Sequence, residues 1–283
     1  HMAHRMLHKL PNLGVRHNGQ FVPTSVVYGI LRGIDSLIGM FESVPLVVFD
    51  SKSHRRLAID PKYKSHRGQM PQHFTVQLGW AMEILSRFGV PAFFIPKYEA
   101  DEVTSLIASF PQDMLPGALV DERVKIVSSD RDFYELLWWK GVTMYDPIRQ
   151  REIDAEYVKD TFGCSPRQIG VLRAIIGDPS DGIPGIRKGV GAKTALKWVT
   201  AGSLGTLTDS EVKQLRLNRR LMKLPGIKDL SAEDHNRFIA ELDGAIEIAR
   251  TKMISPTPML TNLKINVALL KNLVRARSLY PEK

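Results

Sequence analysis

Eight acidic side chains occupy places in this sequence where a metal-dependent reaction could take place. Residues 46–49, 92–95 and 124–127 are short apolar runs typical of buried parallel strands, and acidic residues follow each of them. A further acidic pair lies in the glycine-bounded loop at residues 177–182. The eight acids are Asp50, Glu99, Asp101, Glu102, Asp130, Asp132, Asp178 and Asp181. Because ligands of open α/β sheets bind outside the carboxyl ends of the strands, we expect these carboxylates to converge on one cleft.

A cleft with eight like charges needs either bound cations or raised carboxyl pKa values to offset their repulsion. Carboxylate oxygens suit Mg²⁺ or Mn²⁺ better than zinc, because no set of cysteine and histidine residues accompanies them. Two such ions about 4 Å apart would activate water and stabilise both oxygens of a phosphodiester cleavage. The alternative is that single acids such as Asp130 and Asp178 only cap helices, although capping does not require acids from several strands to converge.

The connection at residues 51–70 is polar and cationic. It carries Arg55 and Arg56, and then Tyr63, Lys64 and Arg67. One interpretation is a mobile arch that grips phosphates and stacks Tyr63 on a base. The other is a solvated loop with incidental charge, and the segment taken alone favours that second interpretation.

A glycine-rich stretch at residues 182–195 indicates contact with phosphates. Gly189 and Gly191 would let the backbone approach a ligand closely, and a helix that begins near Ala192 would present free N–H groups. Thr194 and the cations Lys193 and Lys197 follow. A nucleotide-binding P-loop does not fit, because one residue separates Gly191 from Lys193 and no strand precedes the stretch. A helix-hairpin-helix that binds the DNA backbone fits better, and a plain turn between two helices is the remaining alternative.

Hydrophobic periodicity supplies the elements that would position these residues. It predicts helices at 24–41, 73–88 and 99–110, and a fourth strand at 142–145. Strands that alternate with helices predict an α/β fold with a mostly parallel sheet. After residue 152 only helices are expected, near 154–161, 166–176, 191–200, 210–222, 232–250 and 265–277. We therefore divide the chain into an α/β part, residues 1–150, and a helical part, residues 151–283, with the boundary at 148–153.

The composition is consistent with a protein that binds a polyanion. The 283 residues include 39 Lys and Arg against 30 Asp and Glu, which gives a net charge of +9. No apolar run is long enough for a membrane helix, and the single cysteine, Cys164, cannot form an internal disulfide. We expect no signal peptide and no membrane partner, and an intracellular location in the cytoplasm, the nucleoid or an organellar matrix.

The order of these motifs resembles that of the 5′ nuclease family, which includes the 5′–3′ exonuclease domain of bacterial DNA polymerase I, phage 5′ nucleases and flap endonucleases. The resemblance extends over about residues 4–200. The matching motifs are Phe49-Asp50, Tyr63-Lys64-x-x-Arg67, Tyr98-Glu99-Ala100-Asp101, Ser129-Asp130-x-Asp132, Gly177-Asp178-x-x-Asp181-x-Ile183-Pro184-Gly185 and Gly189-x-Gly191-x-Lys193-Thr194-Ala195.

The resemblance implies a PIN-like α/β domain with a helix–three-turn–helix module at about 166–200 and a helical C-terminal part. Asp50, Glu99, Asp101 and Glu102 would serve one Mg²⁺ or Mn²⁺, and the other four acids a second. Lys64 and Arg67 would hold the scissile phosphate, and the hairpin could hold K⁺. The implied function is a structure-specific 5′–3′ exonuclease or flap endonuclease with a role in DNA replication and repair. It would act as a monomer on 5′ flaps, branched or 5′-ended duplex DNA, or RNA primers.

Three departures from the family pattern keep alternatives open. The first strand of the family, which ends in an aspartate, has no match, since the sequence begins just after it. Glu102 stands where the family has aspartate, and Arg187-Lys188 adds one residue to the hairpin. One alternative is therefore a DNA-structure-binding protein of the same fold with weak or no cleavage. Another is a PIN-type ribonuclease, against which the helix-hairpin-helix argues.

Overall fold

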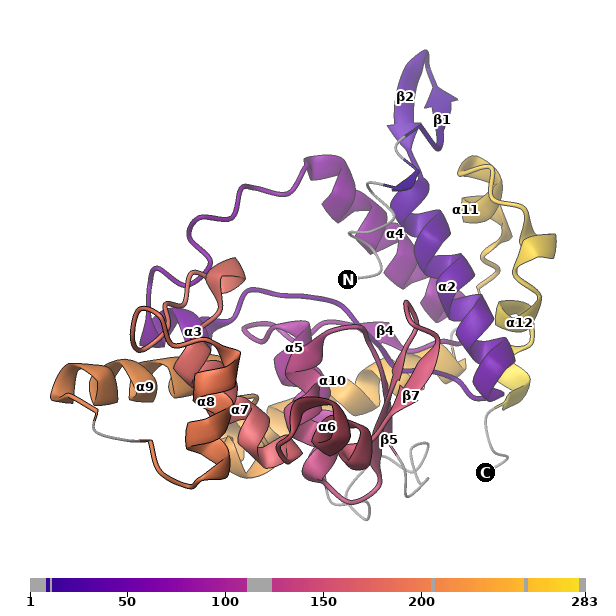
Figure 1. Ribbon diagram of the computed structural model, residues 1–283. Helices are drawn as coiled ribbons and strands as arrows, with labels where there is room; N and C mark the ends of the chain where they lie inside the picture. Colours follow the sequence, from indigo (N-terminus) through magenta and orange to yellow (C-terminus); the bar gives the residue numbers. More distant parts are fainter. Residues whose placement is uncertain (1–8, 11, 111–123, 205–206, 252–253, 280–283) are drawn as a thin grey trace.

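The structure is a computed structural model that describes residues 9–10, 12–110, 124–204, 207–251 and 254–279 (Figure 1). In the first part of the chain, short strands alternate with helices. These elements are β1 (Gly14–His17), β2 (Gln20–Pro23), α2 (Ser25–Phe41), β3 (Val47–Val48), α3 (His54–Ile59), α4 (Gln72–Arg87), β4 (Ala92–Phe93), α5 (Ala100–Ala108), β5 (Val124–Val127), the 3-10 helix η3 (Arg131–Trp138), β6 (Val142–Asp146) and β7 (Arg151–Ile153).

Helices make up the elements after β7. They are α6 (Ala155–Phe162), α7 (Pro166–Ile176), η4 (Pro179–Asp181), α8 (Ala192–Thr200), α9 (Asp209–Met222), η5 (Ile227–Asp229), α10 (Ala232–Thr251), α11 (Thr257–Asn262), η6 (Val267–Leu269), α12 (Lys271–Val274) and η7 (Ala276–Leu279). Within the described ranges, no helix combines the length and apolar character needed to cross a bilayer.

The strands form small sheets. β3 and β4 pair in parallel, with Val47 opposite Ala92. β5 and β6 also pair in parallel, and β7 adds an antiparallel edge to β6. β1 and β2 form a separate hairpin, which projects from the top of the molecule in Figure 1. The predicted mixed α/β architecture with parallel strand pairs is confirmed, and the pairing is distributed over several short sheets.

Most predicted elements are present, and the differences involve short segments. The β1–β2 hairpin, β7 and α3 were not predicted, because three to six residues are too few to show a period. The single helix predicted at 265–277 is wrong: η6, α12 and η7 replace it. Lys264 has a φ of 52°, and the Asn266 side chain accepts a hydrogen bond from the Ala268 amide, so a new turn starts there.

The C-terminal segment covers the first long helix. α2 buries an apolar face that includes Val27 and Leu31, and α4 packs against that helix. Leu270 and Leu273 are fully buried in the same cluster. Buried Asp35 of α2 accepts hydrogen bonds from the backbone amides of Asn272 and Leu273, at 2.8 and 2.9 Å. The last described residues are thus part of the core, beside α2 at the right of Figure 1.

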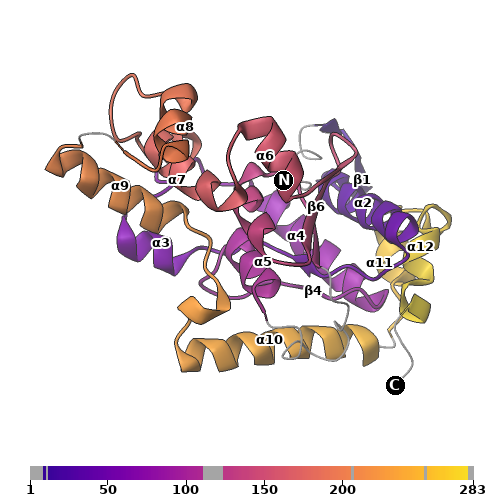
Figure 2. The ribbon, with the colours of Figure 1, turned by 60° about the horizontal axis from the view of Figure 1, so that its bottom comes forward.

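Two further hydrophobic clusters hold the sheets and the helical part together. Ile126 and Met144 of the β5–β6 pair share one cluster with Ile169 and Ile175 of α7. α10 packs Leu242 and its neighbours beneath β4 and α5, and Figure 2 shows this helix running along one edge of the molecule. The predicted division at 148–153 stays a prediction, since the cluster around Ile126 and Ile169 contains residues from both sides of that boundary.

Candidate active site

The first acidic group consists of Asp50, Glu99, Asp101 and Glu102, and it forms where β3 and β4 end. Asp50 follows β3, and its carboxylate accepts a hydrogen bond of 2.9 Å from the Ala100 amide at the start of α5. Glu99 is the N-cap of α5, and Asp101 lies in the first turn. The parallel pairing of the two strands therefore brings their acids to one helix N-terminus, which favours negative charge.

Arg56 of α3 supplies the main counter-charge of this group. Its guanidinium donates to Glu99 and, at 2.8 Å, to Oδ2 of Asp101, while its Nε donates to the Leu221 carbonyl of α9 at 3.1 Å. Arg56 is only 3% exposed. Burial alone would lower the pKa of Arg56, but Asp101, Tyr63 and Glu102 together outweigh burial and raise that pKa above its ordinary value. The sequence predicted that Arg56 contacts DNA, whereas in the structure its guanidinium contacts the carboxylates of Glu99 and Asp101.

Tyr63 and Lys64 connect the first acidic group to Asp181. The Tyr63 hydroxyl lies 3.0 Å from Oδ2 of Asp181 and 3.2 Å from Oε2 of Glu99. Lys64 Nζ lies 2.9 Å from the same Glu99 oxygen and 3.8 Å from Asp181. Burial raises the pKa of Glu99, and Arg56 and Lys64 oppose that rise. The Tyr63 ring is buried beside Lys64 Nζ, so its face is turned to the protein in this conformation.

The second acidic group consists of Asp130, Asp132, Asp178 and Asp181. Asp130 caps η3 by accepting from the Asp132 amide, and Asp178 caps η4 by accepting from the Ser180 amide. Arg173 of α7 joins the two turns, since one of its nitrogens lies 2.5 Å from Asp132 and 3.7 Å from Asp178. α7 packs against η3, which explains why a helix far along the chain supplies this cation.

Burial raises the pKa of Asp132 to about 7, with Arg173 opposing the rise and Asp130 adding to it.

The turn that carries Asp130 is fixed from the other side by Asp146, at the end of β6. Asp146 accepts a 2.6 Å hydrogen bond from the Ser129 hydroxyl and pairs with Arg149. Burial would raise the pKa of Asp146, but these donors outweigh it and hold the pKa at about 2.

The basic connection, residues 51–70, is attached to the loop at 178–182. The Lys64 amide donates to the Asp181 carbonyl at 3.2 Å, and the Arg67 guanidinium contacts both Ser180 and Asp181. His66 Nε2 lies 3.1 Å from the Ser180 carbonyl. The segment, for which a mobile arch and a solvated loop were the two interpretations, forms a helix, α3, followed by turns that contact the second acidic group.

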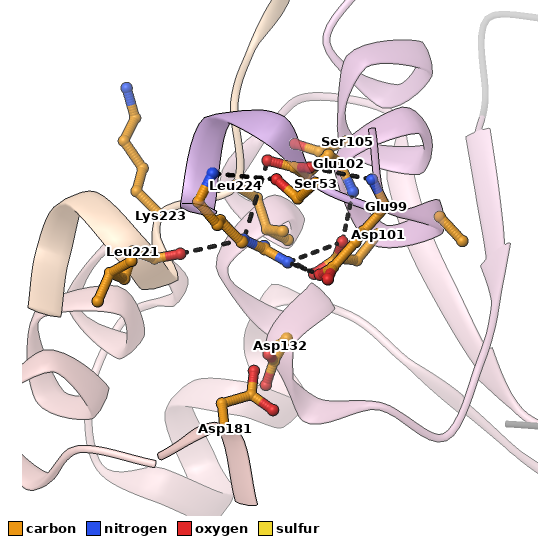
Figure 3. A network of polar contacts seen from close by, with 12 residues as sticks. Ser53, Glu99, Asp101, Glu102, Ser105, Asp132, Asp181, Leu221, Lys223 and Leu224 are labelled. Atoms are coloured by element: carbon orange, nitrogen blue, oxygen red, sulfur yellow. Dashed lines mark hydrogen bonds and ion pairs between the residues drawn. The ribbon is translucent and has the colours of Figure 1, made fainter. Parts of the chain in front are cut away.

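The two acidic groups therefore lie together, and protein cations are interleaved between them. Figure 3 shows Asp132 and Asp181 near the Glu99–Asp101 network. Each of the eight predicted acids accepts a hydrogen bond or ion pair, and in the described ranges no three acidic, histidine or cysteine side chains are grouped as a metal ion would require. The ligand chemistry still fits a divalent metal ion, since all eight side chains would offer carboxylate oxygens to it. Sequence reasoning missed Arg173, whose only signal was a cation in the helix before Asp178.

Comparison with known proteins identifies the family. The profile of the 5′–3′ exonuclease N-terminal resolvase-like domain matches residues 1–163. The chain belongs to the 5′–3′ exonuclease family. It is 36% identical over 177 residues to a 5′–3′ exonuclease of Aquifex aeolicus, covering 62% of this chain and 58% of that protein. It is 31% identical over 206 residues to DNA polymerase I of Bacillus caldotenax, covering 69% of this chain and 22% of that protein.

Solved structures support the same fold for this exonuclease-family chain. The 5′-exonuclease of bacteriophage T5, described with bound zinc ions, superposes with a TM-score of 0.62 at 23% identity, covering 79% of this chain and 91% of that one. The T5 flap endonuclease, described with DNA and metal ions, gives 0.59 at 22% identity and covers 77% and 89%. The predicted family and fold are confirmed.

The glycine-rich turn, residues 182–191, connects α7 and η4 to α8 in this exonuclease-family fold. Gly191 is the N-cap of α8, and Gly189 has a φ of 85° that favours glycine. Gly189, Gly191, Lys193, Thr194 and Lys197 are all exposed, and a Cβ at either glycine would meet no atom within 4 Å. No neighbouring atom would therefore clash with a side chain at position 191, and the open space at the helix start could hold an external group.

Proposed function

We propose that this chain is a structure-specific 5′ nuclease that hydrolyses DNA phosphodiesters. The observation that carries the proposal is the junction of the two acidic groups: Glu99 and Asp181, 82 residues apart in sequence, share Tyr63 and Lys64. The chain spans 22% and 58% of the two relatives named above, so the activity of the complete protein belongs to the proposal.

Carboxylates of both groups would hold two divalent cations, for which we propose Mg²⁺ or Mn²⁺. Asp50, Glu99 and Asp101 are the proposed ligands of one site. The ligands proposed for the other are Asp130, Asp132, Asp178 and Asp181. When bound, the ions would supply an activated water and charge stabilisation for the cleaved phosphodiester. The metal ions in the T5 structures support this assignment by fold.

Lys64 and Arg67 are the proposed phosphate-binding residues. In the structure both cations contact carboxylates, Lys64 with Glu99 and Arg67 with Asp181. A carboxylate that gains another cationic partner releases its lysine or arginine, and the released side chain can then orient a phosphate held at the same position. The basic connection would thereby exchange internal carboxylates for substrate.

The proposed substrate is 5′-flapped, branched or 5′-ended duplex DNA, with RNA primers as a related substrate. The open approach to Gly191 and the exposed Lys193 and Lys197 support duplex-backbone binding at the glycine-rich turn, where K⁺ could also bind. A monomeric, intracellular protein is the accompanying proposal, because genomic DNA is inside the cell.

The decisive assay incubates the purified protein with a labelled 5′-flap DNA and a matched RNA, in Mg²⁺, Mn²⁺ or EDTA. The proposal requires DNA cleavage with either ion and none in EDTA. Cleavage of DNA in EDTA would contradict a two-metal mechanism. Preferential cleavage of the RNA would support a ribonuclease instead.

A catalytically weakened DNA-structure-binding protein is the second candidate. Glu102, which stands at a position of the metal-ligand motif, has both oxygens engaged within the protein. Tight binding of flap DNA without cleavage in either ion would support this candidate.

A further inference from the structure

Glu102 makes two strong internal contacts with its two oxygens. Oε1 accepts from Arg55 Nε at 2.7 Å, and Oε2 accepts from the Glu99 amide at 3.0 Å. The side chain has no exposed surface, and Arg56 Nε also lies 3.8 Å from Oε1. Figure 3 shows Glu102 beside Glu99 within this network. To ligate a metal, Glu102 would have to leave the buried Glu99 amide and the Nε of Arg55 without their acceptor, which is costly.

The extra methylene of glutamate explains why this residue suits the internal role. Glu102 is the third residue of α5, and its side chain reaches back to the N-cap amide in a capping box. The same turn carries Glu99 at the N-cap and Asp101 one residue before Glu102. Glu102 therefore fixes the backbone that orients two carboxylates proposed as ligands.

Arg55 carries this contact to the end of α9. Its two terminal nitrogens donate to the carbonyls of Arg220 and Lys223, at 2.8 and 3.1 Å. These carbonyls lie where α9 ends, and they have no partner inside the helix, so a cation that caps them is favourable. All three donor groups of Arg55 thus serve α5 and α9, although its side chain remains 31% exposed.

We propose that Glu102 and Arg55 form a brace, an ion pair with a buried carboxylate that holds the first turn of α5 against the C-terminal end of α9, and that Glu102 is a positioning residue, not a metal ligand. The proposal rests on the proposed nuclease function. It deepens that function, because the acids would be held at a fixed distance from the helices that follow the glycine-rich turn.

The test compares Glu102→Gln, Arg55→Gln and the double variant with wild type and with Asp101→Asn. Glutamine at 102 keeps the shape and one acceptor but removes the charge that Arg55 binds. Mn²⁺ binding is measured by calorimetry without DNA, and flap cleavage gives kcat and KM separately. Thermal unfolding of all four proteins of the Glu102–Arg55 cycle measures the coupling of the pair.

A brace predicts that Glu102→Gln and Arg55→Gln keep the wild-type number of Mn²⁺ ions and the wild-type Kd, whereas Asp101→Asn weakens or loses an ion. Both brace variants should lower kcat about tenfold with little change in KM, as loss of a group that orients ligands typically does. The double variant should be no worse than either single one. Arg55→Lys should recover part of kcat, because lysine keeps the charge but not all the donors.

Loss of an Mn²⁺ ion in Glu102→Gln but not in Arg55→Gln would overturn the proposal and make Glu102 a ligand. Additive single effects, or an unchanged kcat in both, would also overturn it. If Glu102→Gln does not fold, Arg55→Gln and Arg55→Lys provide the same comparison at a partly exposed position. If wild type binds Mn²⁺ but does not cleave DNA, the nuclease proposal fails, while the metal count and the unfolding cycle still decide on the brace.

Discussion

Lys64 has a position that distinguishes it from the other cations of the basic connection. Its ammonium lies between Glu99, a member of the first acidic group, and Asp181, a member of the second. Its φ of 54° is in the left-handed region, so the turn aims this side chain inward. A lysine at this junction is suited to the phosphate that both groups would share.

We predict that Lys64→Ala lowers the single-turnover rate on flap DNA about a hundredfold, the effect of losing one positioned charge donor. The binding constant for DNA should change much less, because one exposed phosphate contact is a small part of affinity. Alanine adopts the same backbone conformation at no greater cost than lysine. Arg67→Ala should behave in the same way, since Arg67 contacts Asp181.

The control is Lys228→Ala, which removes an exposed lysine of η5. Equal, small effects of all three substitutions on rate and binding would show that the basic connection contributes only general charge.

At the scale of elements, α8 and the glycine-rich turn carry the proposed contact with duplex DNA. Gly191 has a φ of −97°, which any residue can adopt, and the surrounding space is open. Gly189 differs, because its φ of 85° strains other residues. A substitution at Gly191 therefore tests the approach of a ligand without disturbing the fold.

We predict that Gly191→Val weakens binding to duplex-containing DNA while the unfolding temperature stays close to that of wild type. Lys193→Ala should lower the slope of log affinity against log salt by about one, as expected for one lost phosphate contact. Affinity is measured across a salt series in Ca²⁺, to suppress cleavage. Normal DNA binding by folded Gly191→Val, with an unchanged salt slope for Lys193→Ala, would place duplex binding elsewhere.

At the scale of the whole molecule, the C-terminal segment completes the core around α2. Leu270 is fully buried with Leu31 and Val27, and Asp35 holds the start of α12. Leu269, its neighbour in sequence, is 44% exposed. The two adjacent leucines therefore form a matched pair for measuring how far this segment stabilises the fold.

We predict that Leu270→Ala lowers the free energy of unfolding by about 2–5 kcal/mol, the usual cost of a cavity in a packed core. Leu269→Ala should change it by less than about 0.5 kcal/mol, as exposed substitutions do. Denaturant unfolding followed by circular dichroism provides both values. Equal, small effects would mean that the last helices are a separate tail and not part of the core.

The sequence by itself determined the order of the acids, most of the strands and helices, and the family. Periodicity and strand-end spacing are local, so Asp50, Glu99 and Asp130 could be assigned to the ends of predicted strands. The alternative that single acids cap helices also holds in part, since Asp130 and Asp178 do cap η3 and η4. Short elements such as α3 and β7 were missed because their stability comes from partners and not from their own pattern.

Only the tertiary structure decided which cation faces which carboxylate. Arg173 reaches Asp132 because α7 packs on η3. Arg55 reaches the carbonyls at the end of α9 because α3 packs on α9, and from there it also reaches Glu102 of α5. Ion pairs of this kind depend on side chains that are dozens of residues apart, and their partners change with a small shift of one helix. The sequence gives the charge of each residue, whereas burial and contact between distant elements determine which residue that charge is paired with.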